Sequence, residues 1–115
     1  MQYTRINGIT VHYALDGPAD APVVLFANSI GTDLRIWDGV VAELVSEYRL
    51  LRYDMRGHGL TDAPPGPYSM AQLADDAAAL LDALDIRQAH VCGLSLGGMV
   101  AQQLAATRPE RVARA

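Results

Sequence analysis

Short apolar stretches alternate with longer amphipathic stretches along the chain, and this order predicts strands followed by helices. Residues 3–15 alternate in polarity around Asn7-Gly8, a dipeptide typical of the tight turn in a β-hairpin, so two antiparallel strands are expected there. The continuous apolar run at residues 23–27 is typical of a strand buried on both faces of a parallel sheet. Further short strands are predicted at residues 49–53 and 89–93.

Helices are predicted between these strands. Apolar residues recur at the three-and-four spacing of one helical face at Trp37, Val40, Val41, Leu44, Val45 and Tyr48. Ser69 and Gln72 form a capping-box pattern that opens the next helix, and a third helix begins near Leu96 and ends at Arg108-Pro109. Residues 111–115 have the pattern of a lead-in to another strand. The predicted class is therefore α/β, with an antiparallel hairpin followed by parallel strands that alternate with helices.

The composition is that of one soluble globular unit. The 115 residues are 50% hydrophobic and 19% charged, with a net charge of -4, and the basic residues are interspersed with acidic ones, so nucleic acid is not an expected partner. The chain shows neither a secretory h-region at its start nor an apolar run of the roughly 20 residues needed to span a bilayer, which predicts a cytoplasmic protein without a membrane partner. Cys92 is the one cysteine; it lies in an apolar stretch and is predicted to be core, and the cysteine and methionines offer no metal-ligand spacing.

Residues 93–97 spell G-x-S-x-G at the point where a predicted strand gives way to a predicted helix. A sharp turn in this position pushes the serine hydroxyl outward and needs small flanking residues, so Ser95 is the candidate nucleophile. The free NH groups at the start of the following helix stabilise negative charge, and the backbone NH groups of Leu96 and Ile30 are the candidate oxyanion donors. The pattern could also be a plain glycine-rich turn, but the strand-to-helix context favours the nucleophile. A dinucleotide-binding G-x-G-x-x-G motif is excluded because it needs glycine at position 95.

Three segments, residues 26–37, 53–59 and 90–99, resemble the 3-oxoadipate enol-lactonases of the α/β-hydrolase family. Many α/β-hydrolases carry His-Gly where this chain has Asn28-Ser29, and the Asn-Ser version is similar to that of the enol-lactonases. The resemblance implies one domain of about 250 residues, of which residues 1–115 are the amino-terminal part. The family's catalytic acid and histidine follow the nucleophile, whereas here Glu110 is the only acid after Ser95 and no histidine follows.

The resemblance also implies an activity. It is the hydrolysis of 3-oxoadipate enol-lactone, a small-molecule lactone of the β-ketoadipate pathway of aromatic catabolism, by Ser95 and without a cofactor. Arg35 is a candidate for binding the carboxylate of this substrate, with a solvated arginine on a helix face as the plainer alternative. Other α/β-hydrolase activities, as in esterases, cofactor-free haloperoxidase-like enzymes and carbon-carbon bond hydrolases, stay open, as does a non-catalytic binding protein. The 115-residue chain by itself is expected to be inactive.

Several polar residues have plainer interpretations than catalysis. His58 precedes the serine in a glycine-rich loop and is expected to shape that loop, while His12 and His90 are expected to be ordinary packed or surface residues. Asp54 ends a predicted strand, and a loop-stabilising contact with the nearby Arg56 is expected rather than an acid role. None of these residues enters the predicted site.

Overall fold

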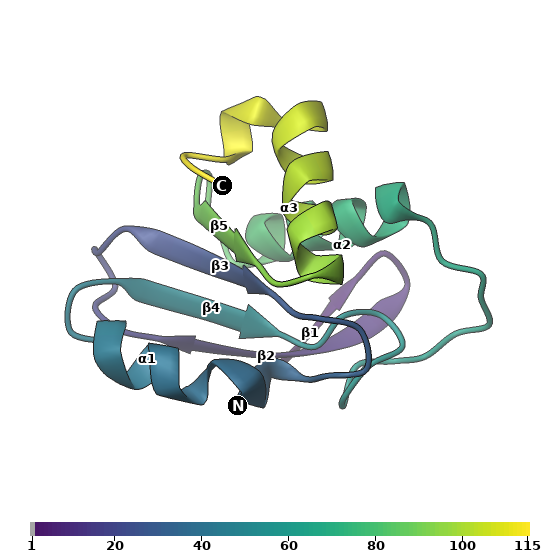
Figure 1. Ribbon diagram of the computed structural model, residues 1–115, viewed down its shortest axis with the longest axis horizontal. Coiled ribbons are helices and arrows are strands. Elements are labelled where there is room, and N and C mark those ends of the chain that lie inside the picture. Colours follow the sequence, from purple (N-terminus) through teal and green to yellow (C-terminus); the bar gives the residue numbers. More distant parts are fainter. Residues whose placement is uncertain (1) are drawn as a thin grey trace.

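A five-stranded mixed sheet organises the chain, and the computed structural model describes it for residues 2–115. Across the sheet the strands follow the order β1 (Gln2–Ile6), β2 (Ile9–Asp16), β4 (Arg49–Tyr53), β3 (Val23–Ala27) and β5 (His90–Gly93), as Figure 1 shows. The pairs β1–β2 and β2–β4 are antiparallel, whereas β3 runs parallel to both β4 and β5. This arrangement confirms the predicted α/β class, with its antiparallel hairpin ahead of parallel strands.

The hairpin turn has the geometry that its dipeptide predicts. Asn7 and Gly8 both have positive φ, 46° and 79°, and Ile6 pairs with Ile9 directly across the turn. Two-residue turns of this kind need positive φ at both central positions, and asparagine and glycine reach that region at least cost. The local sequence therefore sets the register of β1 on β2.

Helices cover both faces of the sheet. The 3-10 turn η1 (Leu34–Trp37) and helix α1 (Asp38–Leu44) lie on one face, and α2 (Met70–Ala83) and α3 (Leu96–Thr107) lie on the other, with the 3-10 turn η2 (Pro109–Arg111) after α3 (Figure 1). As predicted, Ser69 caps α2, because its Oγ accepts a hydrogen bond of 3.0 Å from the NH of Gln72. None of the helices within residues 2–115 is long and apolar enough to cross a membrane.

The first helix is shorter than its apolar pattern predicts. The pattern continues to Tyr48, but α1 ends at Leu44. The carbonyl oxygen of Leu44 accepts hydrogen bonds from the NH groups of both Glu47 and Tyr48, which closes a tight turn in place of a further helical turn. The chain needs this turn because it enters β4 one residue after Tyr48.

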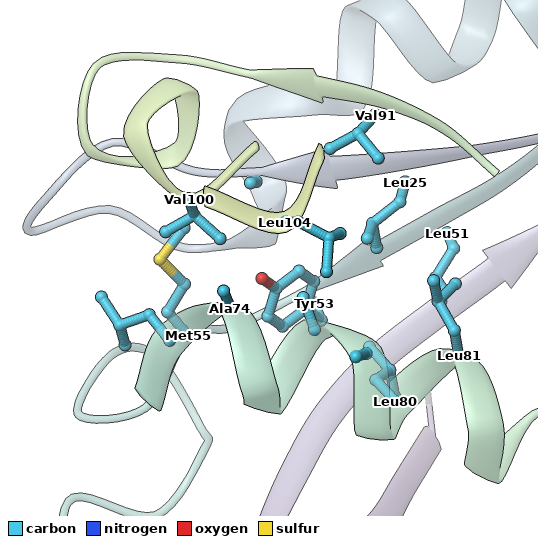
Figure 2. Close-up of a cluster of buried hydrophobic side chains, with 14 of the residues drawn as sticks. Leu25, Leu51, Tyr53, Met55, Ala74, Leu80, Leu81, Val91, Val100 and Leu104 are labelled. Atoms are coloured by element: carbon cyan, nitrogen blue, oxygen red, sulfur yellow. The ribbon is translucent and has the colours of Figure 1, made fainter. Parts of the chain in front are cut away.

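Alternation along the parallel strands divides the core between the two helical layers. Phe26 and Leu50 pack with Trp37 and Val41 on the α1 side of the sheet. The neighbouring residues Leu25 and Leu51 point to the opposite face, where they meet α2 and α3 in the larger cluster shown in Figure 2. The four strand residues are at most 1% exposed, so β3 and β4 are buried on both faces, as the apolar run in β3 predicts.

The residues after η2 begin a further parallel pairing beside β5. Val112 forms a parallel bridge with Ala89, and the NH of Ala113 donates to the carbonyl of Ala89 at 2.8 Å. The NH of Val91 donates to the carbonyl of Arg114 at 2.7 Å. The predicted strand lead-in at residues 111–115 is therefore confirmed in its pairing, although it is too short to count as a strand.

Candidate active site

Ser95 occupies a strained turn between β5 and α3. Its backbone lies at φ 56° and ψ -112°, a region that residues with a side chain rarely adopt. Strain of this kind persists where the surrounding structure enforces it, and functional sites are where it gathers. Ser95 also stands at the N-cap of α3, but its hydroxyl makes no capping hydrogen bond, and the residue is exposed. The hydroxyl is thus exposed rather than used to cap the start of the helix.

Two glycines allow the backbone to pack closely at this turn, Gly93 against the start of α3 and Gly97 against the end of β3. A methyl group at Gly93 would lie 2.3 Å from the carbonyl oxygen of Gly97, and one at Gly97 would lie 1.9 Å from the carbonyl oxygen of Ala27. Both distances are far inside van der Waals contact with backbone atoms. The NH of Leu94 also donates to the carbonyl of Ala27 at 3.0 Å. Close backbone packing therefore explains both glycines of the motif, whereas Gly98 has room, since its nearest such contact is 3.6 Å.

The turn that follows β3 carries the other candidate donor, Ile30. The NH of Thr32 donates to the carbonyl of Ser29 at 3.3 Å, and Gly31 has φ 76°, so residues 29–32 form a β-turn that needs positive φ at its third position. Ile30 is at the second position, its side chain 72% exposed. Within residues 2–115 neither the NH of Ile30 nor that of Leu96 has a hydrogen-bond acceptor, and the first NH groups of a helix have none inside the helix.

Asn28 holds the start of this turn, a role that the sequence did not reveal. The side chain is 1% exposed; its Nδ2 donates to the carbonyl of Tyr53 at 2.8 Å, and its Oδ1 accepts from Nε1 of Trp37 at 2.6 Å. The ring of Trp37 also packs on Phe26, with centroids 4.8 Å apart. From the sequence, Asn28 was identified only as part of the family-specific Asn-Ser pair. The signal that could have indicated its structural role is a polar side chain directly after a buried strand.

Asp54 stabilises the loops, but not through the partner that was expected. Its carboxylate accepts hydrogen bonds from the NH groups of Leu34 (2.8 Å) and Leu60 (2.9 Å) and lies 2.8 Å from Nδ1 of the buried His12. The expected contact with Arg56 is wrong. Arg56, two residues after Asp54, instead forms a buried bidentate ion pair with Asp76 on α2, with distances of 2.8 and 3.0 Å.

The three histidines lie in ordinary structural contacts rather than at Ser95. His12 contacts the carboxylate of Asp54 through Nδ1. Nδ1 of His58 lies 3.1 Å from the carbonyl oxygen of Arg56, in keeping with a loop-shaping role. His90 begins β5. Within the described part of the chain the hydroxyl of Ser95 has no hydrogen-bonded side chain, so residues 2–115 do not present a base to it.

Arg35 is bound by a neighbouring carboxylate. Its Nε and NH2 groups donate to the two oxygens of Asp33 at 3.0 and 2.8 Å, and Asp33 also accepts the backbone NH of Arg35 at 2.9 Å. These hydrogen bonds favour the charged carboxylate and lower the pKa of Asp33 from 3.8 to about 2. The Arg35 side chain is 75% exposed and borders a cavity of about 480 Å³ with Asp33, Leu34 and Asp54.

Neither the cavity beside Arg35 nor a second cavity along α2 reaches Ser95. The cavity beside Arg35 is not lined by Ser95. The larger one, about 720 Å³, runs along α2 beside the Arg56–Asp76 pair. Ser95 is exposed and lies outside both of these cavities.

Within residues 2–115 the prediction that Cys92 is a core residue is wrong, because Cys92 is exposed. Val91 points into the cluster under α2 and α3, so Cys92 points to the opposite face of the sheet. On that face η1 and α1 cover Phe26 of β3 and Leu50 of β4, and they do not extend over β5.

The turn, its glycines and the sheet order define the class of protein. Residues 22–115 match the family model for the alpha/beta hydrolase fold, and the chain belongs to this family.

The chain is also similar to individual proteins of known name. The chain is 46% identical over 103 residues to 3-oxoadipate enol-lactonase 2 of Acinetobacter baylyi, covering 90% of this chain and 39% of that protein. The enol-lactonase from Burkholderia xenovorans LB400 superposes with a TM-score of 0.94 at 45% identity, over 96% of this chain and 44% of that one. Est816, an N-acyl homoserine lactone degrading enzyme, superposes with a TM-score of 0.90 at 32% identity, over 96% and 42% of the two chains. The chain thus spans less than half the length of these relatives.

Proposed function

We propose that the natural full-length protein containing this sequence is a serine hydrolase that opens 3-oxoadipate enol-lactone to 3-oxoadipate in the β-ketoadipate pathway. The observation that carries the proposal is Ser95, held at φ 56° on a glycine-flanked strand-to-helix turn with its hydroxyl outward and free of capping. The similarity to two enol-lactonases supports the choice of a lactone as substrate. Residues 1–115 are, in this proposal, the amino-terminal part of one catalytic domain.

The proposed chemistry has two steps. The Oγ of Ser95 attacks the lactone carbonyl while a histidine from outside residues 1–115, oriented by an acid, takes its proton. The ring C–O bond breaks and an enolate leaves, which accepts a proton and ketonises. Water, deprotonated by the same histidine, then attacks the acyl-enzyme and releases 3-oxoadipate and free Ser95. This chemistry needs neither a metal nor an organic cofactor.

The backbone supplies the electrostatic part of the catalysis. The NH groups of Ile30 and Leu96, which have no acceptor within residues 2–115, stabilise the oxyanion formed on the carbonyl oxygen. Leu96 begins α3, so the positive end of the helix dipole adds to its effect. Arg35, whose side chain is 75% exposed, is proposed to bind the substrate carboxylate, and this ion pair would orient the lactone ring.

Replacement of the nucleophile tests the proposal. In the natural full-length protein, Ser95→Ala should lower kcat for the enol-lactone and for a simple aryl ester by a factor on the order of 10⁴ or more, because the covalent route is lost. Circular dichroism should be unchanged. Ser46→Ala, which alters an exposed serine after α1, serves as the matched control and should retain full activity. Undiminished hydrolysis by the Ser95→Ala protein would overturn the assignment.

A further inference from the structure

The turn at residues 29–32 is anchored at both ends by buried side chains. At its start the Asn28 amide bonds to the ends of two other elements, the Tyr53 carbonyl of β4 and the Trp37 indole of η1. Beyond its end the NH of Leu34 is bound by the carboxylate of Asp54 at 2.8 Å. Between these anchors the turn itself is exposed, with Ile30 at its tip. The position of the Ile30 NH is therefore set by the buried contacts of Asn28 and Asp54 on either side of the turn, and not by packing of the Ile30 side chain.

Asn28 also touches the nucleophile turn through its backbone. A methyl group at Gly97 would lie 2.7 Å from the carbonyl oxygen of Asn28 and 1.9 Å from that of Ala27. The first turn of α3 thus rests on the peptide groups of residues 27 and 28. A shift of the Asn28 backbone would move the Ile30 NH on one side and press on the start of α3, where Leu96 donates, on the other.

We propose that Asn28 is a positioning residue for catalysis: its side-chain amide fixes the NH of Ile30 relative to the NH of Leu96 and so builds the oxyanion site. This inference rests on the proposed function. An uncharged amide suits the task because it donates and accepts at once, whereas a carboxylate only accepts and alanine does neither. At 1% exposure, water cannot replace either contact without opening the core.

The test is Asn28→Asp in the natural full-length protein, an isosteric change that keeps an acceptor for Trp37 but removes the donor to the Tyr53 carbonyl. A donor displaced by about 1 Å can cost on the order of 100-fold in rate, so kcat should fall about 10- to 100-fold while KM changes less than about twofold. The affinity for a trifluoromethyl ketone, which forms an oxyanion on Ser95, should fall by the same factor as kcat. A role in stability alone would not tie inhibitor affinity to kcat.

Two further variants, Trp37→Phe and Asp76→Asn, test the role of Asn28 independently. Trp37→Phe removes the donor to Asn28 Oδ1, keeps an aromatic ring against Phe26, and should lower kcat and inhibitor affinity together, even if the Asn28→Asp protein does not fold. Asp76→Asn makes the reverse exchange, of a carboxylate for an amide, at a buried site outside the turn. Asp76 is 3% exposed and pairs with Arg56, and this variant should keep kcat within about twofold.

The outcomes separate the two proposals. Absence of Ser95-dependent hydrolysis in the unmodified protein overturns the proposed function and the role of Asn28 with it. An active protein in which Asn28→Asp and Trp37→Phe leave kcat unchanged overturns only the positioning role. An equal loss of kcat in Asp76→Asn would show a general effect of disturbed buried polar groups and would also overturn it.

Discussion

Arg35, which we propose to bind the substrate carboxylate, already donates two side-chain hydrogen bonds to Asp33. Asp33 accepts one hydrogen bond from Nε and one from NH2 of Arg35, so a substrate carboxylate must use the NH1 group and the second hydrogen of NH2, or displace Asp33. We expect Arg35→Ala to raise KM for the enol-lactone about tenfold, the equivalent of one charged hydrogen bond, with little change in kcat. KM for a neutral aryl ester should be unaffected. Steady-state kinetics with both substrates checks this, and an unchanged KM for the lactone would exclude Arg35 as its ligand.

The same variant has a pH signature. The pKa of Asp33 is lowered from 3.8 to about 2 mainly by its side-chain hydrogen bonds to Arg35, so the stabilisation from this pair is complete above pH 3.8 and is lost as the pH falls toward 2. In Arg35→Ala the pKa of Asp33 should return toward 3.8, as followed by NMR of the carboxyl carbon. The change in stability itself should be small because Arg35 is largely exposed.

Single residues mark the limit of what the sequence predicts at the site. The strand-to-helix turn at Ser95 and the close packing of Gly93 and Gly97 were predictable because a local motif specifies them. The partner of Asp54 was not, because His12 lies 42 positions away and the sheet order decides that β2 lies next to β4. Proximity along the chain favoured Arg56, which reaches α2 instead. The exposure of Cys92 likewise depends on how far α1 extends across the sheet.

At the scale of elements, the junction of α3 with β3 yields a matched pair of substitutions. Gly97→Ala would place a methyl group 1.9 Å from the backbone carbonyl of Ala27, so α3 must move. We expect a loss of about 1–3 kcal/mol in the free energy of unfolding, as for overpacking in a packed core, together with a change in the geometry of the Ser95 turn. Gly98→Ala, one residue further along the helix, meets nothing closer than 3.6 Å and replaces glycine inside α3.

Gly98→Ala should therefore raise the free energy of unfolding by about 0.5–1 kcal/mol through helix propensity alone. Urea unfolding of the two variants of the natural full-length protein measures both effects. Equal stability of the Gly97→Ala and Gly98→Ala proteins would mean that α3 does not press on residues 27 and 28 as the structure shows.

Elements themselves were largely predictable, since their signals are local. The hairpin turn, the apolar strand at residues 23–27 and the Ser69 cap each form where a short-range rule predicts them. The one overextended element, the helix continued to Tyr48, failed because periodicity of apolar residues does not reveal where the chain must turn to enter the next strand. Val45 and Tyr48 still pack against the cluster on the α1 side of the sheet. The pattern therefore predicted which side chains are packed there but not that the backbone leaves the helix after Leu44.

At the scale of residues 2–115 as a whole, four exposed apolar side chains lie on the segments that follow the parallel strands. Ile30 follows β3, Leu60 lies in the loop after β4, and Leu94 and Met99 flank the nucleophile turn after β5, with exposed fractions from 51% to 72%. The carboxyl ends of parallel strands meet at one edge of a sheet, where α/β proteins bind their ligands. In the proposed function, these apolar side chains would contact the ring of the lactone.

The same edge shows what residues 1–115 lack for turnover. A serine hydroxyl needs a base within hydrogen-bonding reach, and within the described residues the histidine contacts are to Asp54 and to the carbonyl of Arg56. We expect the isolated 115-residue chain to hydrolyse an aryl ester no faster than its own Ser95→Ala variant, while the natural full-length protein does so with full dependence on Ser95. Amide exchange protection of β3 and β4 would establish that the isolated chain is folded during the assay. Turnover by the folded chain above that of its Ser95→Ala variant would mean that residues 1–115 supply their own base, and the assignment of the histidine to another part of the protein would be wrong.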